Sequence, residues 1–445
     1  MSSVKKILHI APHLNGGLGN VLTLQSRCRD TDHYIYLIES KAEDYPNINK
    51  NHSGKLLDYT HSAIADTISK YDIVQVEYWN HPLIYKLVLS GVLDDAKCLI
   101  GCAHIQGDQA PQLISENIIE YFDHMLITGQ WLSATAKDQR ILGKISFVRY
   151  PIDTVKFSPS SQNNPSSSNS KLRACYVGTV SFSKMSRDFF DIVQACTDFL
   201  DFIIVGEPDD EVRSHPGFHD SNISFIGRSK DVVSYLRKSD IFIYPLRKGH
   251  YGTGELALVE ALSCGLPTVA FNNESEMSLI ENNYNGVLCS NKGDFVRALQ
   301  RLSSSEKLRN SLGAAARKKI AKLYNFEGFE AFLRNFYGSI YHNRERAKYK
   351  IYKEELLKEV DDGGKCFIQS LQGIKNVNAN VIPSIISAMS PSICAKKKKI
   401  AISFFERYPE YKYKSKGGLG HYRYCFPESI SFENLMKHLS TKDQP

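Results

Sequence analysis

The stretch Arg247–Pro267 reads RKGHYGTGELALVEALSCGLP and decides how its surroundings fold. It follows an apolar run that ends near Pro245, which predicts a β-strand leading into a glycine-rich loop. Thr253 is a good N-cap, ELALVEALSC has helical composition, and Gly265 and Pro267 close the helix. The first turn of such a helix presents unpaired N–H groups and a positive dipole end, so a diphosphate is its natural ligand.

Short apolar, β-branched runs alternate with helical patterns on both sides of this stretch. The alternation is typical of βαβ units and of a parallel sheet that is buried on both faces. A polar segment at 158–170, SPSSQNNPSSSNS, separates two groups of runs and reads as a linker or surface loop. We expect strands at Lys6–Ile10, Tyr34–Ile38, Ile73–Val76, Cys98–Cys102, Met125–Thr128 and Ile145–Val148, and then at Leu172–Val177, Phe202–Val205, Ile223–Ile226, Ile241–Tyr244 and Thr268–Phe271.

With 445 residues and 42% hydrophobic content, the chain is long enough to bury two cores. Ten cysteines without a CxxC pair, and the lack of zinc-ligand spacing, indicate reduced thiols rather than disulfides or a structural metal. His9, Pro12 and His13 interrupt the first apolar run before it reaches signal-peptide length, and no stretch approaches the roughly 18 apolar residues of a membrane span. We therefore expect a cytoplasmic protein, soluble or peripheral on the inner face of the membrane.

Residues 341–445 contain 19 Lys and Arg against 11 Asp and Glu, so the formal net charge of +7 belongs to this tail. The tail holds a charged, helix-like run at 344–359 and four consecutive lysines, Lys396–Lys399, but its pattern predicts no overall fold. Such a segment can bind an anionic membrane surface, at about 1 kcal/mol per basic residue. A solvated basic surface or a partner-docking extension is an equal alternative, and no nucleic-acid-binding module is recognisable.

The run GTGELALVEALSCGLPTVAF, which begins at Gly252, resembles the donor-site helix of GT-B glycosyltransferases, in particular of the retaining family 4 enzymes. The resemblance covers residues 1–341 and implies an α/β, GT-B fold with two Rossmann-like domains facing across a cleft, plus a C-terminal extension. The implied parts are an acceptor-side domain at 1–157, a nucleotide-sugar donor domain at 171–325, a helix crossing back to the first domain at 326–341, and the basic extension at 342–445.

In that family two glutamates eight positions apart flank the donor loop. Glu260 matches the second glutamate, which would bind the ribose hydroxyls of the donor. The first glutamate falls on Gly252, but Glu255 offers a carboxylate three positions later, in an H-Y-G-T-x-E order that resembles a subset of the family. Alternatively, Glu255 is a first-turn carboxylate that only complements the helix dipole. Further donor contacts are expected from Thr253, Gly254 and Leu256.

A second match is the segment YVGTVSFSK, in which family members carry a glycine-rich strand end followed by an arginine and a lysine that neutralise the donor diphosphate. Lys184 matches the lysine by its spacing from Gly178, and Thr179 stands at the arginine position. A lysine here would stabilise the departing diphosphate most strongly in the transition state; a solvated surface lysine is the alternative. The candidates for the missing charge are Arg247 and Arg228.

In the first domain, the loop HLNGGLGN follows the first strand, so Gly16 and Gly17 would bring the backbone close to a donor at the carboxyl ends of the strands. A tight turn without a ligand is the alternative, and the incomplete dinucleotide fingerprint disfavours a dehydrogenase. His104 also follows a strand, where family members often have a histidine facing the donor sugar; a structural histidine is an equal alternative. Trp79 and Asn80 end another strand and would line the acceptor side.

Together these matches imply a retaining, hexosyltransferase-type glycosyltransferase of the EC 2.4 class. It would move a sugar from a nucleotide-sugar donor to a saccharide or lipid-linked saccharide in polysaccharide or lipopolysaccharide biosynthesis, with no nucleic-acid partner. Lys184, Glu255 and His104 are the predicted catalytic residues, and no metal or cofactor is expected because no Asp-x-Asp motif follows a strand. Two alternatives stay open: a catalytically silent GT-B partner subunit, for which Gly252 and Thr179 speak, and a nucleotide-sugar epimerase or phosphorylase.

Overall fold

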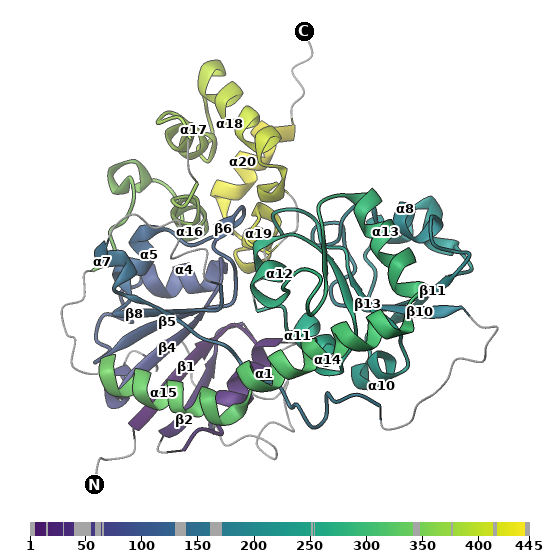
Figure 1. Cartoon of the computed structure of the whole chain (residues 1–445). Coiled ribbons are helices and arrows are strands. Elements are labelled where there is room, and N and C mark those ends of the chain that lie inside the picture. Colours follow the sequence, from purple (N-terminus) through teal and green to yellow (C-terminus); the bar gives the residue numbers. More distant parts are fainter. Residues whose placement is uncertain are drawn as a thin grey trace. The chain divides into compact units, whose positions relative to one another are not determined.

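The computed structural model describes residues 5–14, 17–29, 31–39, 55–57, 64, 66–129, 139–160, 171–250, 252, 254–340, 348–374, 377–412 and 416–440. The chain divides into two compact units (Figure 1). The first unit consists of residues 1–148 and 332–445, and the second of residues 149–331. Each unit contains one large parallel sheet, which confirms the expected α/β class.

The first unit is built on a seven-stranded sheet of order β3-β2-β1-β4-β5-β8-β9, in which all paired strands are parallel. The central strand β4 has all six residues buried, as expected for a sheet covered on both faces. The strands span Lys5–Ala11 (β1), Thr31–Leu37 (β2), Lys55–Leu57 (β3), Ile73–Tyr78 (β4), Leu99–Ala103 (β5), His124–Ile127 (β8) and Ile145–Phe147 (β9). Two of them, β3 and β9, have three residues each, and β3 is an element that the sequence pattern did not predict.

Short helices connect these strands, and local sequence explains where α4 begins. His81 is its N-cap and accepts the N–H of Leu83 at Nδ1 (3.2 Å), while Pro82 occupies the first helical position, where no N–H is needed. The connecting elements are α1 (Gly17–Gln25), a 3₁₀ turn (η2, Ile68–Lys70), α4 (Pro82–Leu89), the hairpin strands β6 (Asp108–Gln109) and β7 (Gln112–Leu113), α5 (Glu116–Tyr121) and α7 (Gln139–Leu142).

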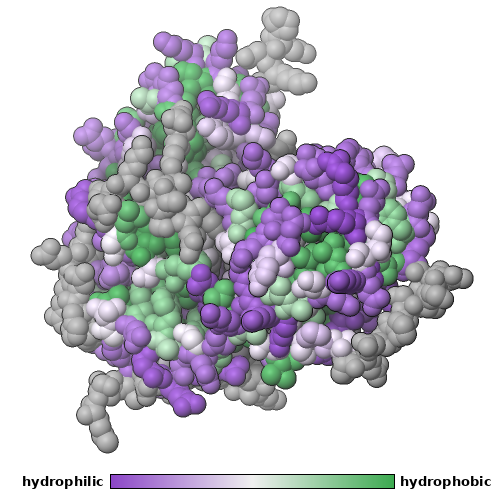
Figure 2. Space-filling model, in the orientation of Figure 1, coloured by the Kyte–Doolittle hydropathy of each residue, from purple (hydrophilic) through white to green (hydrophobic). Residues whose placement is uncertain are grey.

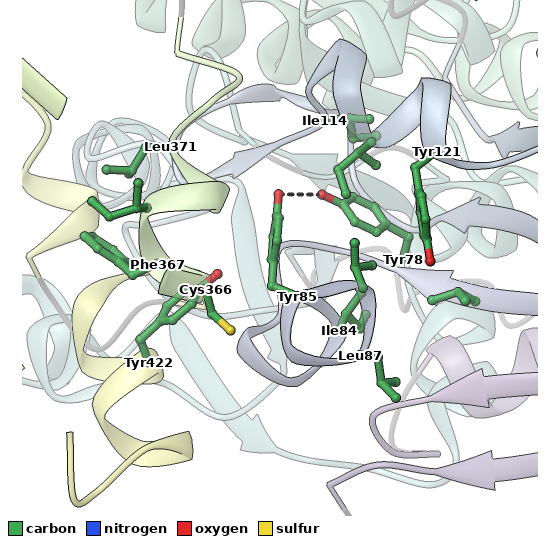
Figure 3. Packing of buried hydrophobic residues seen from close by; sticks show 14 of the residues in the cluster. Tyr78, Ile84, Tyr85, Leu87, Ile114, Tyr121, Cys366, Phe367, Leu371 and Tyr422 are labelled. Atoms are coloured by element: carbon green, nitrogen blue, oxygen red, sulfur yellow. Dashed lines mark hydrogen bonds between the residues drawn. The ribbon is translucent and has the colours of Figure 1, made fainter. Parts of the chain in front are cut away.

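The tail folds into helices that complete the core of the first unit. Phe367 and Tyr422 are buried in the same apolar cluster as Tyr78 and Tyr85 of the sheet and of α4 (Figure 3). The helix-like run predicted at 344–359 is wrong for the residues described there, which hold only a 3₁₀ turn. The tail elements are η4 (Glu354–Leu357), α16 (Asp362–Ser370), α17 (Val381–Ala388), α18 (Ala395–Arg407), η5 (Pro409–Tyr411), α19 (Leu419–Cys425) and α20 (Ile430–Ser440).

The second unit has a six-stranded parallel sheet of order β12-β11-β10-β13-β14-β15. Its strands span Leu172–Val177 (β10), Leu200–Val205 (β11), Ile223–Gly227 (β12), Ile241–Tyr244 (β13), Thr268–Phe271 (β14) and Val287–Cys289 (β15). Its helices are α8 (Phe189–Gln194), α9 (Asp210–Arg213), η3 (Pro216–His219), α10 (Val232–Arg237), α11 (Leu256–Ser263), α12 (Glu274–Leu279), α13 (Lys292–Ser303) and α14 (Glu306–Leu323). A further helix, α15 (Phe326–Ile340), begins in this unit and continues into the first.

The division between the units lies earlier than the polar segment at 158–170. Residues after Val148 already pack on the second unit: Arg317 donates to the carbonyl oxygens of Thr154 (2.7 Å) and Phe157 (3.0 Å), and Phe157 is buried in that unit's core. At the other end, α15 leaves the second unit, and the hydroxyl of Tyr337 donates to Gln75 Oε1 in the first (2.9 Å).

All ten cysteines lie in the described part of the chain, and none forms a disulfide, in agreement with the expected reduced thiols. Within that part, no helix is long and apolar enough to cross a bilayer. Hydrophilic residues cover much of the face shown in Figure 2.

Candidate functional site

The carboxyl ends of two neighbouring strands position the candidate site of the second unit. Lys184 follows β10 and Arg247 follows β13, and these strands pair in parallel, so both segments reach the same edge of the sheet. There the backbone N–H of Arg247 donates to the carbonyl oxygen of Lys184 (2.9 Å). The structure therefore fixes Lys184 next to the loop that leads into α11.

Glu255 stands at the N-cap of α11 and points its carboxylate at Lys184. Its Oε2 accepts a hydrogen bond from Lys184 Nζ (3.2 Å) and another from the hydroxyl of Tyr244, the last residue of β13. The backbone of Glu255 has φ 31° and ψ 50°, a left-handed conformation that is strained for a residue with a side chain. Strain of this kind persists only where surrounding contacts fix it, and it gathers at functional sites.

Gly252 lies directly beside this carboxylate. A Cβ atom at position 252 would be 2.0 Å from Glu255 Oε1, so no side chain fits while Glu255 holds this position. The same oxygen is buried and has no hydrogen-bond partner among the residues described. The glycine that departs from the family pattern is thus sterically coupled to the glutamate that follows it.

The electrostatics of the cluster keep Glu255 ionised. Burial opposes its ionisation, but the positive charge of Lys184, followed by His250 and the hydrogen bond from Tyr244, outweighs burial and lowers the pKa. For Tyr244, burial and the nearby Glu255 carboxylate raise the pKa well above its ordinary value, so the phenol keeps its proton and donates.

His250 forms a second layer behind Glu255. Its Nδ1 accepts the backbone N–H of Gly252 (3.1 Å), so the neutral ring carries its proton on Nε2, which donates to Glu276 Oε1 (3.1 Å). Ser275 completes the group through its hydroxyl, 3.2 Å from the same ring nitrogen. These contacts orient the loop between β13 and α11.

Glu260 lies further along α11 and has a different environment. Burial raises the pKa of its carboxyl to about 7, with Lys156 opposing this shift only in part. Arg247 is half-buried, and its Nε has no hydrogen-bond partner in the described part of the chain. Glu260 can therefore accept a hydrogen bond from a ligand, and Arg247 Nε can donate one without the loss of an existing hydrogen bond.

The remaining predicted residues of the second unit lie at the strand end and in the loop. Gly178 has φ 151°, and a Cβ there would be 2.9 Å from the hydroxyl of Tyr176. Thr179 is exposed, and its carbonyl oxygen accepts the hydrogen bond of that hydroxyl (2.8 Å). Thr253 lies outside the described residues, whereas Gly254 and Leu256 flank the Glu255 N-cap; α11 begins later than an N-cap at Thr253 would place it.

In the first unit, His104 ends a chain of buried polar groups that crosses the sheet. Its Nε2 donates to Glu77 Oε2 (2.7 Å), and Glu77 Oε1 accepts from His9 Nδ1 (2.9 Å). His9 Nε2 in turn contacts His33 Nδ1 (2.8 Å). Burial opposes the ionisation of Glu77, but the hydrogen bonds from His104 and His9 outweigh it and hold its pKa at about 2. Glu77 thus fixes the orientation of His104.

The glycine-rich loop of the first unit is described only in part. Gly16 lies outside the described residues, and Gly17 is the exposed first residue of α1. Gly19 is held close to the preceding turn, since a Cβ there would be 2.1 Å from the carbonyl oxygen of Leu14. The structure brings together Lys184, Glu255 and Arg247 in one unit, while Gly17 and His104 belong to the other.

Sequence reasoning missed Tyr244, His250 and Glu77 as site residues. Tyr244 was recognised only as the end of a strand, although a strand's last residue reaches the ligand edge of a parallel sheet. His250 stands in the quoted H-Y-G-T-x-E order, which was the available signal for it. Glu77 had a signal too, because a carboxylate within a strand rich in apolar residues requires a buried partner.

The candidate site of the second unit lies in a region that is similar to known proteins. Residues 168–319 match the family model described as Glycosyl transferases group 1. An uncharacterized glycosyltransferase of Methanocaldococcus jannaschii is 23% identical over 168 residues, which are 35% of this chain and 42% of the relative. The UDP-Gal:alpha-D-GlcNAc-diphosphoundecaprenol alpha-1,3-galactosyltransferase of Escherichia coli is 30% identical over 134 residues, 28% of this chain and 33% of the relative. The chain thus matches less than half the length of each curated relative.

Solved structures extend the similarity to both units. HepE of Anabaena in complex with UDP and glucose has a TM-score of 0.62 at 14% identity, covering 75% of this chain and 100% of that one. Sucrose-phosphate synthase of Thermosynechococcus elongatus has a TM-score of 0.60 at 14% identity, covering 76% and 99%. The expected GT-B fold with two parallel α/β sheets is confirmed, as is the resemblance to group 1 glycosyltransferases.

Proposed function

We propose that the protein transfers a sugar from a nucleotide-sugar donor to a saccharide acceptor, on the premise that residues 168–319 match the Glycosyl transferases group 1 model. The observation that carries the proposal is the ion pair between Lys184 Nζ and Glu255 Oε2 (3.2 Å) at the start of α11. It places a cation, a carboxylate and a helix N-terminus at the ligand edge of one sheet.

The proposed chemistry assigns a part of the donor to each group. The diphosphate lies at the N-terminus of α11, where Lys184 and the unpaired first-turn N–H groups face the charge that grows as the glycosidic bond breaks. The sugar donates a hydroxyl hydrogen bond to the unpartnered Oε1 of Glu255. Glu260 accepts from the ribose, and His104 stays a predicted contact of the donor sugar.

Retention of configuration and independence of metals are parts of the proposal that rest on the family resemblance. In a front-face transfer, the bond from the anomeric carbon to the diphosphate oxygen breaks with its electrons on the diphosphate. The acceptor oxygen bonds to the same face of that carbon, and its proton passes to the leaving phosphate oxygen. No protein nucleophile is needed, and Lys184 neutralises the leaving group. Hexosyl transfer is the corresponding expectation for the donor.

A lipid-linked saccharide is the acceptor class that we favour. The name of the Escherichia coli relative gives a diphosphoundecaprenol-linked acceptor, which supports a role in cell-surface polysaccharide or lipopolysaccharide synthesis on the cytoplasmic face of the membrane. Lys396, Lys397 and Lys399 of α18 are exposed and can approach anionic lipids. Replacing Lys396–Lys399 by glutamine should abolish binding to phosphatidylserine vesicles; unchanged binding would remove the membrane part of the proposal.

Calorimetric titration of the full-length protein with UDP, GDP, ADP and CMP tests the donor site. We expect one nucleotide to bind and its affinity to fall by about 10- to 100-fold in Lys184→Ala, because a hydrogen bond to a charged group is lost. Lys292→Ala is the matched control, since Lys292 forms an exposed ion pair with Asp191 away from the cluster. Failure of all four nucleotides to bind would contradict the proposal and favour a silent partner subunit.

A further inference from the structure

The tail of the chain reaches the carboxyl-end edge of the first sheet, and we propose that it completes a site there for an acceptor saccharide bearing an oxyanion, either a carboxylate or a phosphate. The inference deepens the proposed function and rests on it. Trp79 and His81 follow β4, Glu39 follows β2, and Lys416 and His421 come from the tail. The carboxyl ends of parallel strands are where such sheets bind ligands.

Specific contacts hold the tail against this edge. The hydroxyl of Tyr422 donates to Asn80 Oδ1 (2.9 Å), and Gln112 Nε2 donates to the carbonyl oxygen of Lys416 (2.6 Å). Gly417 has φ 83°, and a Cβ there would lie 2.8 Å from Gln112 Nε2. Because only glycine suits this close approach, the position of Lys416 is built into the fold.

Aromatic rings then fix the lysine side chain. Lys416 Nζ lies 4.1 Å from the centre of the Trp79 ring, a favourable cation–π distance. Trp79 stacks on His81 (5.6 Å, 5°), and His81 meets His421 edge to face (4.8 Å, 89°). The indole therefore holds an ammonium group from the tail.

The two histidines present N–H groups at this edge. Each accepts a backbone N–H at Nδ1, His81 from Leu83 (3.2 Å) and His421 from Gly417 (3.2 Å), so each neutral ring carries its proton on Nε2. His81 donates that proton to Glu39 Oε2 (3.3 Å). A ring nitrogen that carries a proton cannot ligate a metal, which argues against a metal ion here.

Three donors at this edge lack an acceptor among the residues that the structure describes. They are the buried Nε1–H of Trp79, the Nε2–H of the half-buried His421 and the ammonium of the exposed Lys416, which forms no ion pair within that part of the chain. A buried donor such as the Nε1–H of Trp79 normally has an acceptor, and an oxyanion would also form the stronger, charge-assisted hydrogen bond with the ammonium of Lys416. A ligand with a carboxylate or phosphate supplies what the site lacks.

Burial sets the protonation of the groups at this edge. Burial, then His81 and Lys416, lower the pKa of His421 to about 4, and Glu39 offsets them only in part. The side chain of Lys416 is exposed as a whole, yet burial of its ammonium lowers its pKa, with Glu39 again opposing. Both histidine rings are therefore neutral at neutral pH, and the ammonium of Lys416 is the cation that this edge offers to a ligand, beside the carboxylate of Glu39.

Binding of three probes to the full-length protein tests the site: glucose, glucuronate and glucose 6-phosphate, followed by ligand-observed NMR. We expect at least one charged probe to bind about tenfold more tightly than glucose, because it forms one additional charge-assisted hydrogen bond. The probe that binds tells carboxylate from phosphate. Lys416→Ala should remove the preference and Lys416→Arg should keep it, while Lys437→Ala, which removes an exposed charge from α20, should change nothing.

Equal binding of all three probes, no binding of either charged probe, or a preference that survives in Lys416→Ala would overturn the inference. UDP titration of the same samples separates it from the proposed function. A Lys416→Ala protein that binds UDP normally but has lost the preference supports the acceptor site, whereas failure of the native protein to bind any nucleotide is a failure of the donor proposal.

Discussion

The carboxylate of Glu255 occupies the space into which a side chain at Gly252 would project, with only 2.0 Å between Oε1 and the position of a Cβ at 252. A chain with this loop geometry can carry a carboxylate at one of these positions but not at both. Glycine at 252 is therefore the steric counterpart of Glu255, which supports the prediction that the Glu255 carboxylate replaces the family glutamate expected at position 252.

Gly252→Ala should destabilise the protein by about 1–3 kcal/mol and weaken nucleotide binding, because the added methyl group forces Glu255 away from Lys184. The free energy of unfolding from denaturant titration measures the first effect. Gly338→Ala is the control: it is an exposed helical glycine with nothing within 4 Å of the new Cβ, and it should stabilise by about 0.5–1 kcal/mol. Equal behaviour of the two variants would contradict the steric coupling.

Lys184→Met leaves the buried Glu255 without its main cation and should cost about 3 kcal/mol of unfolding free energy. The double variant Lys184→Met/Glu255→Gln should recover part of this loss, since the uncompensated charge is gone. A double-mutant cycle in denaturant measures the coupling. Additive effects of the two substitutions would show that the pair does not interact.

Glu260→Gln should stabilise the ligand-free protein at high pH. Burial raises the pKa of Glu260 to about 7 from an ordinary value of 4.5, so its ionisation disfavours the folded state as pH rises through this range and is fully unfavourable above it. We expect a gain on the order of 1–3 kcal/mol at about pH 8 and almost none at about pH 4. The same variant should bind the nucleoside less tightly; a gain of equal size at both pH values would contradict the assigned pKa.

Glu77→Gln should reduce the sensitivity of the first unit to acid. The pKa of Glu77 is lowered to about 2 from 4.5, so its contribution is present above about pH 4.5 and is lost as pH falls toward the folded-state value. The full difference is on the order of 3 kcal/mol. Unfolding free energies measured across this acidic range should fall less steeply in the variant, and an unchanged slope would show that the carboxylate is not held ionised.

Addition of EDTA should leave transferase activity unchanged, because the proposal assigns the leaving-group charge to Lys184 and to the N–H groups of α11. Activity on one nucleotide sugar, measured with and without chelator and with Mg²⁺ restored, tests this. A loss that Mg²⁺ or Mn²⁺ reverses would show that a metal shares the role given to Lys184.

Much of the second unit was predictable because the residues that mark its strands and turns are close together in the sequence. Ile241–Tyr244 and Thr268–Phe271 are strands with the predicted bounds, since each is a β-branched or aromatic run closed by a turn residue. Val287–Cys289 and Lys55–Leu57 are strands of three residues that the sequence analysis did not predict. Thr253 had the chemistry of an N-cap, but Glu255 takes that position in a left-handed conformation that no composition rule indicates.

The tail could not be predicted from its pattern, because its apolar residues meet partners that lie far away in the sequence. Phe367 and Tyr422 pack among residues of β4 and α4. The same limit applies to the candidate sites: Lys184 and Glu255 have motif spacing, whereas the contact of Lys416 with Trp79 depends on how the tail folds back.

The hydrogen bond from the Tyr422 hydroxyl to Asn80 joins residues 342 positions apart, which affects the order in which the two units can fold during synthesis. A ribosome that adds about 5–20 residues per second needs roughly 15–60 s after completing the last strand of the first sheet to deliver the helices that cover it. The second unit is contiguous in the chain and can fold during that interval. During that interval the apolar side chains of β4 and α4 lack the tail residues that pack against them in the finished fold.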